Sequence, residues 1–597
     1  MAKNMADTQM IRRSFALILA RAVKKLRPEG KLGAGSAVKN GFYYDFLFEE
    51  TPSGEFLNSV EKAMEEIIDE NIKLRKESLP LEDVTNIFSE RGEIFKIELA
   101  QLLGRENPTI PLCWLGDFAD ICESPLVENT GELPKEGFCM EEISSAYFLG
   151  DETREVMARL GGVAFKDKEN LSVFKKRREE IAKRDHKYLG RELELFTISE
   201  DVGRGLPMLL PKGATIRRIL ERFIVDEELK RGYQHVYTPI LGKKDLYVKS
   251  GHWQLYQDSM YPPIRFNDEE YILRPMSCPH HFMLYNSQFH SYKDLPIRYA
   301  EIAPMYRREQ SGELSGLVRV MGFHLADAHI MCRPDQLKDE FREVMDLINH
   351  LIKCLGLGEV CWFRASLRGE KSNKYVDDEE AWKKSEEVLI QLLEEQNRDF
   401  VVKRGTATFY GPKLDVQMKN VWGKEETLFT NQIDMVLAER FDMYYIDKEN
   451  RKRRPIIIHR SSIGCIERTM AFLIEHYNGA FPLWLAPVQV RLLPISERQV
   501  QYSKEIYTKM RREGIRVELD ERNLSTGKKV REGRLQRIPY LGIIGDKELG
   551  NNTVTVRSRD TGEQKEIDYQ HIIKMVLKED RTKSMENLSV FKHEKLN

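Results

Sequence analysis

The chain has 597 residues, of which 93 are basic and 95 acidic, so its formal net charge is −2. Length alone predicts about four domains. The near balance of charge excludes attraction of a polyanion by the whole molecule, so such a partner must meet local basic patches. No stretch approaches the ~20 apolar residues of a membrane span, and the eight cysteines form no CxxC pair, so we expect a cytoplasmic protein without a disulfide framework.

The N-terminal part, residues 1–155, predicts a mixed α+β domain. Helical spacing covers residues 10–30 and 56–75, and the run GFYYDF at residues 41–46 is typical of a strand. Residues 156–192 then predict a connecting region, because a long charged helix over residues 172–196 dominates it. Its charges suit either a solvated connector or the border of a polyanion site.

Residues 193–483 predict the largest domain. Helical patterns cover residues 214–231, 334–357, 377–396 and 464–477, and strand patterns cover residues 234–240, 400–402, 414–418 and 455–459.

Residues 484–580 predict a separate α/β domain with a largely parallel sheet, because strands and helices alternate at residues 488–493, 500–513, 515–520, 528–536 and 540–545. Residues 581–597 predict a frayed tail. The segment ENLSVFK occurs at residues 169–175 and again at 586–592, and we have no physical account of this echo.

A β-hairpin is predicted over residues 300–332, with a turn rich in Ser and Gly at residues 311–316. Such a hairpin brings together two arginines, a glutamate and an aromatic ring, at Arg307, Glu309, Arg319 and Phe323. Guanidinium groups suit phosphate, a carboxylate suits an adenine amino group, and an aromatic face suits the ring. A surface hairpin with scattered salt bridges explains these residues equally well.

A metal site is the next question, because Cys278, His329 and His459 are ligand types. They lie far apart in the sequence, so spacing does not predict zinc. A buried cysteine and two core histidines account for the same residues.

Seven motifs stand out along the chain. They are SGHW (250–253), PMSCPHH (275–281), YRREQSGELSGLVRVMGF (306–323), DAHIMC (327–332), FYGPK (409–413), HRSSIGCIER (459–468) and WLAPVQV (484–490). In these motifs and their order, the chain resembles the threonyl-tRNA synthetases, a family of class II aminoacyl-tRNA synthetases, over nearly its whole length. The resemblance implies a catalytic antiparallel sheet flanked by helices, preceded by an α+β editing-like domain and followed by an α/β anticodon-binding domain. It also implies a threonine–tRNA ligase whose substrates are ATP, L-threonine and tRNA(Thr).

The resemblance also implies a zinc ion, one per subunit, on Cys278, His329 and His459. Three protein ligands leave a position open, as in metals that meet a substrate. Threonine can chelate such a metal through its amino and hydroxyl groups, whereas valine offers no hydroxyl and is rejected. Serine fits the chelate and lacks only a methyl group. Asp327 and Tyr410, together with Arg307, match the family's threonine-binding positions.

Other site residues follow from the same resemblance. The family's ATP contacts match Arg307, Glu309, Arg319, Phe323, Gln432 and Arg468, and Mg²⁺ is expected with the ATP. Lys413 matches a catalytic position beside the adenylate, as do Arg307 and Arg468. His252 matches the histidine that helps remove the tRNA hydroxyl proton, a role suited to a near-neutral pKa. The family's anticodon contacts match Asn523, Arg531, Glu548 and Arg557.

Three departures from the family pattern are visible. Leu325 stands where many members have Gln, and Cys465 where many have Ser; both are interpreted as tolerated variation. The editing domain of the family carries three histidines and a cysteine, and the matching positions here are Arg13, Leu17, Cys122 and Leu126. Only the cysteine is kept, so we predict a folded domain that does not hydrolyse seryl-tRNA. The family also carries a small domain before this one, and we expect that domain to be absent here.

Residues 214–239 match the family's dimer element, so we expect a homodimer. Two rival functions remain. One is a paralogue that regulates or binds RNA without aminoacylation, which loss of Cys278, Arg307 or Arg468 would have favoured; all three are present. The other is a ligase for a different threonine-like amino acid, or a duplicate that resists an inhibitor.

Overall fold

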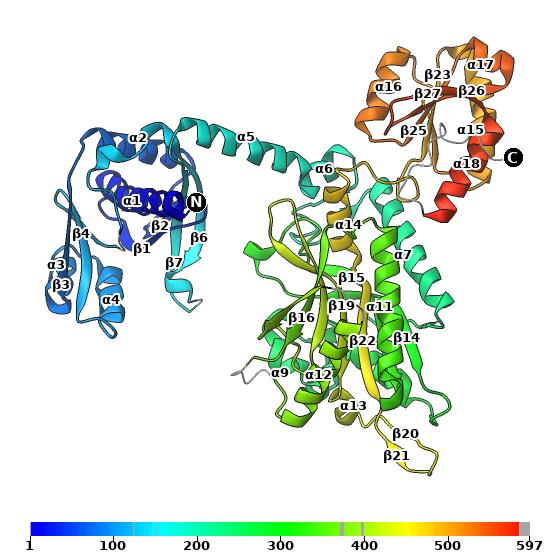
Figure 1. The fold of residues 1–597 in the computed structure, drawn as a ribbon, viewed down its shortest axis with the longest axis horizontal. Helices are drawn as coiled ribbons and strands as arrows, with labels where there is room; N and C mark the ends of the chain where they lie inside the picture. Colours follow the sequence, from blue (N-terminus) through cyan, green and yellow to red (C-terminus); the bar gives the residue numbers. More distant parts are fainter. Residues whose placement is uncertain (1, 123–124, 152, 370–374, 396–398, 584–597) are drawn as a thin grey trace. The chain divides into compact units, whose positions relative to one another are not determined.

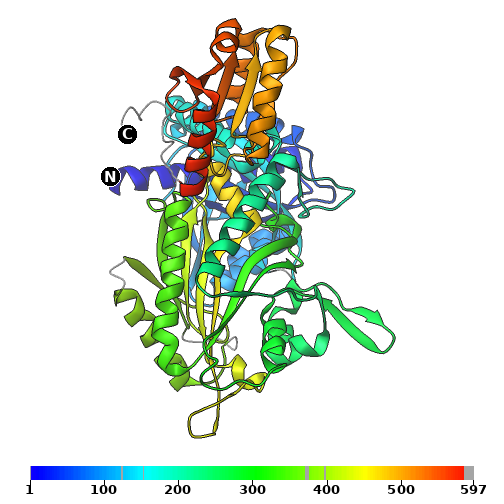
Figure 2. The ribbon, with the colours of Figure 1, turned by 90° about the vertical axis from the view of Figure 1, so that its right-hand side faces the viewer.

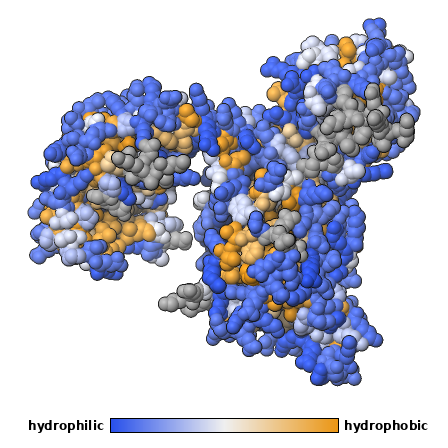
Figure 3. Space-filling view, in the orientation of Figure 1, coloured by the Kyte–Doolittle hydropathy of each residue, from blue (hydrophilic) through white to orange (hydrophobic). Residues whose placement is uncertain are grey.

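The computed structural model describes residues 2–122, 125–151, 153–369, 375–395 and 399–583. The chain divides into two compact units, Met1–Glu180 and Ile181–Asn597 (Figure 1). Within the described part of the chain, no helix has both the length and the hydrophobicity that a bilayer crossing needs. Figure 3 shows a mostly hydrophilic surface, with hydrophobic residues visible on both units.

The N-terminal unit contains a four-stranded antiparallel sheet in the order β1-β2-β7-β6 and a three-stranded sheet in the order β3-β4-β5. Helices α1 and α2 pack on each other, and α1 packs on β1 and β2. The elements are α1 (Ala2–Leu26), β1 (Lys31–Ala37), β2 (Gly41–Leu47), α2 (Glu55–Asp69), β3 (Leu74–Pro80), α3 (Leu81–Glu90), α4 (Ile94–Leu103), β4 (Thr109–Leu115), β5 (Phe118–Ile121), β6 (Phe138–Tyr147) and β7 (Val156–Ala164).

Several boundaries in this unit differ from the predictions. Helix α1 ends at Leu26 rather than residue 30, because Pro28 cannot continue a helix. Helix α2 ends at Asp69 rather than residue 75, and Asn71 turns the chain at a φ of 47°. The predicted domain end at residue 155 precedes β7, which pairs with both β2 and β6. This strand therefore belongs to the sheet and not to a connecting region.

The single charged helix predicted over residues 172–196 is two helices, α5 (Lys168–Arg184) and α6 (His186–Glu192). They are separated at Asp185, whose backbone is extended and whose side chain accepts a hydrogen bond from the Lys187 amide at 2.7 Å. An aspartate at such an N-cap starts a new helix. The first ENLSVFK copy lies on α5, whereas the second copy and most of the predicted tail lie outside the described residues.

The second unit is built on an eight-stranded sheet in the order β10-β14-β15-β22-β19-β18-β16-β17. It is antiparallel except at its two edges, where β10 joins β14 and β17 joins β16 in parallel. Helix α11 packs along β22, β15 and β19, and α14 packs on α6, α7 and β15 (Figures 1 and 2). The predicted antiparallel sheet flanked by helices is confirmed.

The strands of this sheet are β10 (Gln234–His235), β14 (Ile297–Tyr306), β15 (Gly322–Cys332), β16 (Cys361–Leu367), β17 (Phe400–Arg404), β18 (Lys413–Lys419), β19 (Glu425–Asp434) and β22 (Ile456–Cys465). The main helices are α7 (Pro211–Lys230), α8 (Lys244–Ser250), α9 (His252–Tyr256), α10 (Cys278–Asn286), α11 (Leu337–Cys354), α12 (Glu379–Glu395), α13 (Leu437–Arg440) and α14 (Ile466–His476). Shorter strands are β8 (Phe196–Thr197), β9 (Met208–Leu209), β11 (Leu241–Lys243), β12 (Ile264–Phe266), β13 (Glu269–Leu273), β20 (Tyr445–Ile446) and β21 (Lys452–Arg453).

Two predictions in this region need correction. The strand predicted at residues 234–240 is only the two residues of β10. The helix predicted from residue 464 begins at Ile466, because Gly464 still belongs to β22. Gly464 has a φ of +69°, and a Cβ there would lie 1.9 Å from the Leu428 carbonyl oxygen. A glycine is thus required where β22 passes close to β19.

The C-terminal part has a five-stranded sheet in the order β24-β23-β25-β26-β27. The first three strands are parallel, as predicted, and the last two are antiparallel strands that the sequence pattern did not reveal. The elements are β23 (Val490–Pro494), α15 (Val500–Arg512), β24 (Val517–Leu519), α16 (Thr526–Leu535), β25 (Tyr540–Ile544), α17 (Asp546–Asn551), β26 (Thr553–Ser558), β27 (Gln564–Asp568) and α18 (Tyr569–Thr582).

Candidate functional site

A row of residues crosses the middle of the eight-stranded sheet. His329 on β15 lies directly opposite His459 on β22, His459 lies opposite Gln432 on β19, and Gln432 lies opposite Lys413 on β18. Directly opposed residues point to the same face of a sheet, with Cβ atoms about 5 Å apart. The register therefore gathers four predicted site residues, drawn from four strands, on one face.

This face forms a cavity of about 390 Å³, here called the central cavity. Most of the predicted site residues line it, namely His252, Cys278, Arg307, Glu309, Arg319, Asp327, His329, Tyr410, Gln432 and His459. Leu325 also lines it. Phe323, Lys413 and Arg468 do not line the central cavity, although the guanidinium of Arg307 lies 5.2 Å from the Phe323 ring centre. The scattered residues of the sequence thus form one site.

The predicted metal ligands Cys278, His329 and His459 are buried, and one potential ligand atom of each lies within 4.8 Å of the others. Helix α10 begins at Cys278 and supplies the sulfur, while β15 and β22 supply the two rings. One thiol and two imidazoles form a donor set that fits zinc.

Hydrogen bonds leave one lone pair of each histidine available. The His459 Nε2 lies 2.8 Å from the Asp434 carboxylate, so Nε2 donates and Nδ1 keeps its lone pair. The His281 Nε2 lies 3.2 Å from Glu301, and the His281 Nδ1 lies 2.8 Å from the His329 Nδ1. His281 therefore donates to Glu301 and accepts from His329, which keeps the lone pair of the His329 Nε2. The protein network assigns the tautomers that a metal requires.

The supporting residues His281, Glu301 and Asp434 were not predicted from the sequence. His281 stands inside the PMSCPHH motif, which was the only local signal for it. Asp434 is fully buried, and its Oδ1 accepts the backbone amides of Val436 and Leu437 at 2.8 and 2.9 Å. This carboxylate is fixed at the start of α13, and it orients His459.

Burial controls the electrostatics around the donor set. It raises the pKa of the Cys278 thiol well above its usual range, and the carboxylates of Asp327 and Asp434 raise it further. Burial also lowers the pKa of His329 well below its usual range, with nearby His459, His281 and Arg460 acting in the same direction. The His329 ring is therefore a neutral ligand, and a divalent cation would stabilise the thiolate that burial disfavours.

Arg307 and Arg319 also line the central cavity, and they lie in the segment that joins β14 to β15. Burial lowers the pKa of Arg307, and its Nε donates to the Pro275 carbonyl oxygen at 3.2 Å. Arg319 pairs with Glu309 at 2.8 Å and with Glu313 at 2.7 Å. The predicted hairpin is confirmed, but both arginines lie outside its strands.

His252 departs from one expectation. Burial lowers its pKa to about 3, and His459, Arg307 and Arg440 lower it further, so the near-neutral pKa expected from the sequence is wrong. The Ser250 hydroxyl donates to the Tyr247 carbonyl oxygen at 3.0 Å and lies 2.7 Å from the His252 Nδ1. The Nδ1–H therefore donates to Ser250, which leaves the Nε2 as an acceptor on a neutral ring.

The two departures Leu325 and Cys465 lie directly opposite each other on β15 and β22. Both pack against a small apolar cluster that contains Ala303, Met305 and Phe323. Burial raises the pKa of Cys465 to about 12, so it remains a thiol. The two apolar replacements are thus one local contact.

The N-terminal unit has a pocket of about 520 Å³, here called the N-terminal pocket. The four predicted editing positions, Arg13, Leu17, Cys122 and Leu126, all line it. The hydrogen bond with Cys113, together with burial, raises the pKa of the Cys122 thiol.

Asp120, which lines the N-terminal pocket, is held by two partners. It pairs with the buried Lys96 at 2.5 Å and accepts the Tyr44 hydroxyl at 2.7 Å. Three of the four predicted editing positions, Arg13, Leu17 and Leu126, are cationic or apolar, and the fourth is Cys122.

The predicted anticodon contacts differ in accessibility. Asn523 and Arg531 are exposed, and Arg557 is half-buried on β26. Glu548 is buried, and its two oxygens accept hydrogen bonds from the Gly545 amide at 2.8 Å and the Thr555 hydroxyl at 2.7 Å. Its carboxylate supports the α17 turn, so a direct contact with a base requires it to leave these partners.

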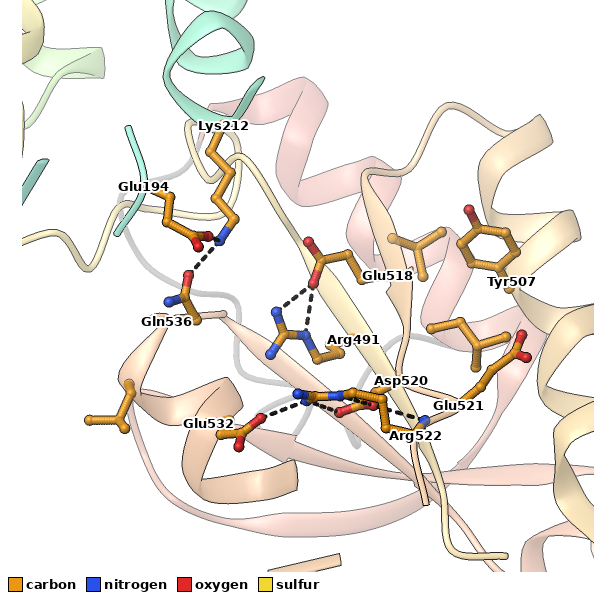
Figure 4. A pocket seen from close by; sticks show the side chains of 13 residues that line it. Glu194, Lys212, Arg491, Tyr507, Glu518, Asp520, Glu521, Arg522, Glu532 and Gln536 are labelled. Atoms are coloured by element: carbon orange, nitrogen blue, oxygen red, sulfur yellow. Dashed lines mark hydrogen bonds and ion pairs between the residues drawn. The ribbon is translucent and has the colours of Figure 1, made fainter. Parts of the chain in front are cut away.

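A further pocket, of about 780 Å³, lies where Glu194 and Lys212 meet the C-terminal sheet (Figure 4). Its charged side chains are engaged with one another: Lys212 with Glu194 at 2.7 Å, Arg491 with Glu518 at 2.5 Å, and Arg522 with Asp520 and Glu532 at 2.7 and 2.6 Å (Figure 4). Size alone does not make this pocket a site, because each of its basic groups is already paired with an acidic one.

Comparisons with known proteins agree with this geometry. Residues 261–477 match the tRNA synthetase class II core domain (G, H, P, S and T), and residues 489–579 match the anticodon binding domain. The chain is 46% identical to the threonine–tRNA ligase of Geobacillus sp. (strain WCH70), over 93% of this chain and 86% of that one. It is also 46% identical to that of Clostridium perfringens (strain SM101 / Type A), over 92% of this chain and 85% of that one.

Among solved structures, the RNA binding domain of threonyl-tRNA synthetase from Cryptosporidium parvum Iowa II matches with a TM-score of 0.63 and 34% identity, covering 66% of this chain and 98% of that one. The class II core, the anticodon binding domain and the long alignments lead to one family. The chain belongs to the threonine–tRNA ligases, a family of class II aminoacyl-tRNA synthetases.

Proposed function

We propose that this ligase selects threonine with a zinc ion held by Cys278, His329 and His459, and that it lacks a working editing site for serine. One observation carries the first part. Two buried histidines, oriented by Asp434 and by the His281–Glu301 pair, present free lone pairs beside a buried cysteine. When bound, zinc supplies a Lewis acid that recognises the amino and hydroxyl groups of threonine together.

Residues of the chain would complete the threonine site. Asp327 lies in the central cavity, and its carboxylate accepts a hydrogen bond from the Ser277 hydroxyl. Tyr410 stacks on His459 with ring centres 4.7 Å apart, and its hydroxyl donates to Gln432 at 2.7 Å. These contacts fix the walls around the donor set, which supports a site shaped for one small amino acid.

Activation of threonine needs no general base, because its carboxylate is already the nucleophile that attacks the α-phosphate of ATP. Positioning and neutralisation of charge supply the rate enhancement. We assign this role to Arg307, Arg319 and Arg468, with Lys413 beside the adenylate and Mg²⁺ accompanying the ATP. Arg319 exchanges its partners Glu309 and Glu313 for phosphate in this proposal, and the freed Glu309 meets the adenine amino group.

His252 would act in the second step, in which a tRNA hydroxyl attacks the adenylate. Its neutral ring, with Nε2 as an acceptor, is suited to receive a hydrogen bond from that hydroxyl. The low pKa makes it a positioning acceptor rather than a strong base.

Loss of editing is supported by the N-terminal pocket. Leu17 and Leu126 cannot bind or activate water, and Cys122 is held as a thiol. Asp120 and Lys96 bond to each other, so they offer little to a reacting ester. We infer that the N-terminal unit is retained as a contact for the tRNA acceptor end.

We also propose a cytoplasmic homodimer that reads the anticodon of tRNA(Thr) with the exposed Asn523 and Arg531. Around the predicted dimer element, Tyr237 is 95% exposed and Leu229 is 54% exposed. The proposed dimer would cover these apolar side chains.

ATP–pyrophosphate exchange with threonine, valine and serine tests the proposal. The full-length protein should exchange with threonine and serine but not with valine. Equal exchange with valine would defeat the zinc argument, and exchange with an unrelated amino acid in place of threonine would favour a ligase of different specificity.

A further inference from the structure

A buried cluster of Asp185, His186 and Glu475 lies outside the central cavity. The three residues are 5%, 2% and 3% exposed. Their types suit a metal, and their ligand atoms lie within 4.8 Å of one another. Each of these atoms, however, already has a protein partner, which favours a positioning role.

His186 joins two distant parts of the chain. Its Nε2 accepts a hydrogen bond from the Leu317 backbone amide at 3.2 Å, so its Nδ1 must carry the proton that bonds to Glu475 at 2.7 Å. Leu317 belongs to the turn between β14 and β15 that also carries Arg319. The ring is therefore a fixed bridge from α14 to this turn.

The turn is shaped around the histidine ring. Gly316 has a φ of +50°, and a Cβ at this position would lie 2.2 Å from the His186 Nε2. Ser315 and Arg319 close the turn with hydrogen bonds in both directions, at 3.1 and 3.2 Å. These internal hydrogen bonds and the contact with the buried His186 ring fix the position of the turn.

The same turn also binds Arg468, to which we assigned a phosphate contact above. Arg468 on α14 donates to the Val318 carbonyl oxygen and to the Thr427 carbonyl oxygen, each at 3.0 Å. Glu475, also on α14, accepts the Val421 amide at 2.9 Å, and Asp185 accepts the Trp422 indole at 2.7 Å. These bonds tie the β18–β19 turn, α14 and the Arg319 turn into one unit.

From this juxtaposition we infer that His186 is a positioning residue for ATP: it fixes the turn that holds Arg319 and Arg468 at the triphosphate. The inference rests on the proposed roles of these two arginines. It predicts that the hydrogen bond to Leu317, and not the mere presence of a buried polar side chain, sets the affinity for ATP.

Two variants separate the two hydrogen bonds of His186. In His186→Gln, the amide oxygen reaches the place of Nε2 and still accepts the Leu317 N–H. In His186→Asn, the amide nitrogen stands near the place of Nδ1 and still donates to Glu475, but the Leu317 N–H loses its acceptor. Each variant loses one buried hydrogen bond, and thermal unfolding measures any difference in stability between them.

The Kd for ATP from calorimetry and the KM values from ATP–pyrophosphate exchange are then compared. We expect His186→Asn to raise the Kd and KM for ATP about 5- to 30-fold, the range for one lost hydrogen bond. The KM for threonine should change less than about twofold, and His186→Gln should stay within about threefold of the parent. Gly316→Ala, which displaces the turn while leaving His186 bonded to Glu475, should act like His186→Asn.

Equal ATP affinities in the Gln and Asn variants would overturn the inference, as would equal rises in the KM for ATP and threonine. Failure of the parent protein to exchange with threonine would instead count against the proposed function. The calorimetric comparison of ATP binding still decides the role of His186 in that case.

Discussion

The central cavity and the N-terminal pocket are of comparable size, about 390 and 520 Å³, yet they differ in what their polar groups can do. In the central cavity, Asp434 binds the Nε2 of His459 and His281 binds the Nδ1 of His329. The other nitrogen of each ring keeps its lone pair for a metal. At the N-terminal pocket, Asp120 is bonded to the buried Lys96 behind it, and leucines stand at two of the predicted editing positions.

On the proposed loss of editing, a similar frame does not imply the same chemistry. The N-terminal unit has its two sheets and the Tyr44–Asp120 hydrogen bond. Function depends on a few side chains placed in such a frame, and three of the four predicted editing positions carry Arg or Leu. In the second unit, one cysteine and two histidines lie together with the residues that orient the two rings.

The largest expected effect comes from removing one of the three proposed zinc ligands. Cys278→Ser should reduce zinc content well below one per subunit and lower threonine-dependent exchange by more than about 100-fold, since loss of a supporting residue alone costs 10–100-fold. Metal analysis and exchange kinetics measure both. Cys332→Ala, at a buried cysteine of β15 that is not a predicted zinc ligand, is the control and should keep its zinc. Full activity of a zinc-free Cys278→Ser protein would contradict the account.

A second effect concerns the support behind His329. Burial raises the pKa of Glu301, but hydrogen bonds from His281 and Arg274 outweigh it and lower this pKa from 4.5 to about 2. The folded-state pKa is depressed, so the stabilisation is complete above pH 4.5 and is lost as the pH falls toward 2. At pH 7 it is worth about 3 kcal/mol, roughly 100-fold in the unfolding constant.

Denaturant unfolding of Glu301→Gln at several pH values tests this. The difference in stability between parent and variant should be about 3 kcal/mol at pH 7 and should shrink to about 1 kcal/mol by pH 3. A difference that is the same at both pH values would show that Glu301 acts through packing and not through its charge.

A third test tries to make the N-terminal pocket resemble an active site. Combining Arg13→His, Leu17→His and Leu126→His should raise hydrolysis of Ser-tRNA(Thr) at least about tenfold above the parent, because positioned acid–base groups typically contribute 10²–10⁴-fold. The single variant Arg13→His serves as the control and should show little gain. No gain in the triple variant, if it is folded, would show that the pocket has also lost its substrate contacts.

The smallest expected effect lies at Leu325 and Cys465. Because the two side chains are opposed and share one apolar cluster, Leu325→Gln and Cys465→Ser should each change kcat/KM for threonine by less than about threefold. The double variant should depart from the sum of the single effects, as contacting residues do. A change above tenfold would assign Leu325 a direct role in selection.

Part of the fold could be predicted from strong local signals. The hairpin of β14 and β15 and the parallel strands of the C-terminal domain follow from runs of apolar residues and turn residues, whereas the antiparallel sheet was predicted only from the family resemblance. Strand β7 was missed because its pairing partners β2 and β6 are set by tertiary contacts. The break at Asp185 was missed because charged residues mask an N-cap in a continuous helical pattern.

The site was predictable only through motifs. Residue types favoured no metal, since the pairing of His329 with His459 is a register between strands some 130 residues apart, and local patterns do not contain such a register. Asp434, His281 and His186 went unnoticed because their roles come from hydrogen bonds that only the folded chain creates. The sequence also does not show that His252 is buried, and this burial lowers its pKa to about 3.

Mischarging with serine tests the central claim most directly. The full-length protein is incubated with ATP, serine and tRNA(Thr). Free serine is then removed, and the amount of Ser-tRNA(Thr) is measured over time. The account predicts that Ser-tRNA(Thr) accumulates and then decays at its spontaneous rate. In a parallel reaction with valine in place of serine, no Val-tRNA(Thr) should form. Decay clearly faster than the spontaneous rate, dependent on the N-terminal unit, would contradict it.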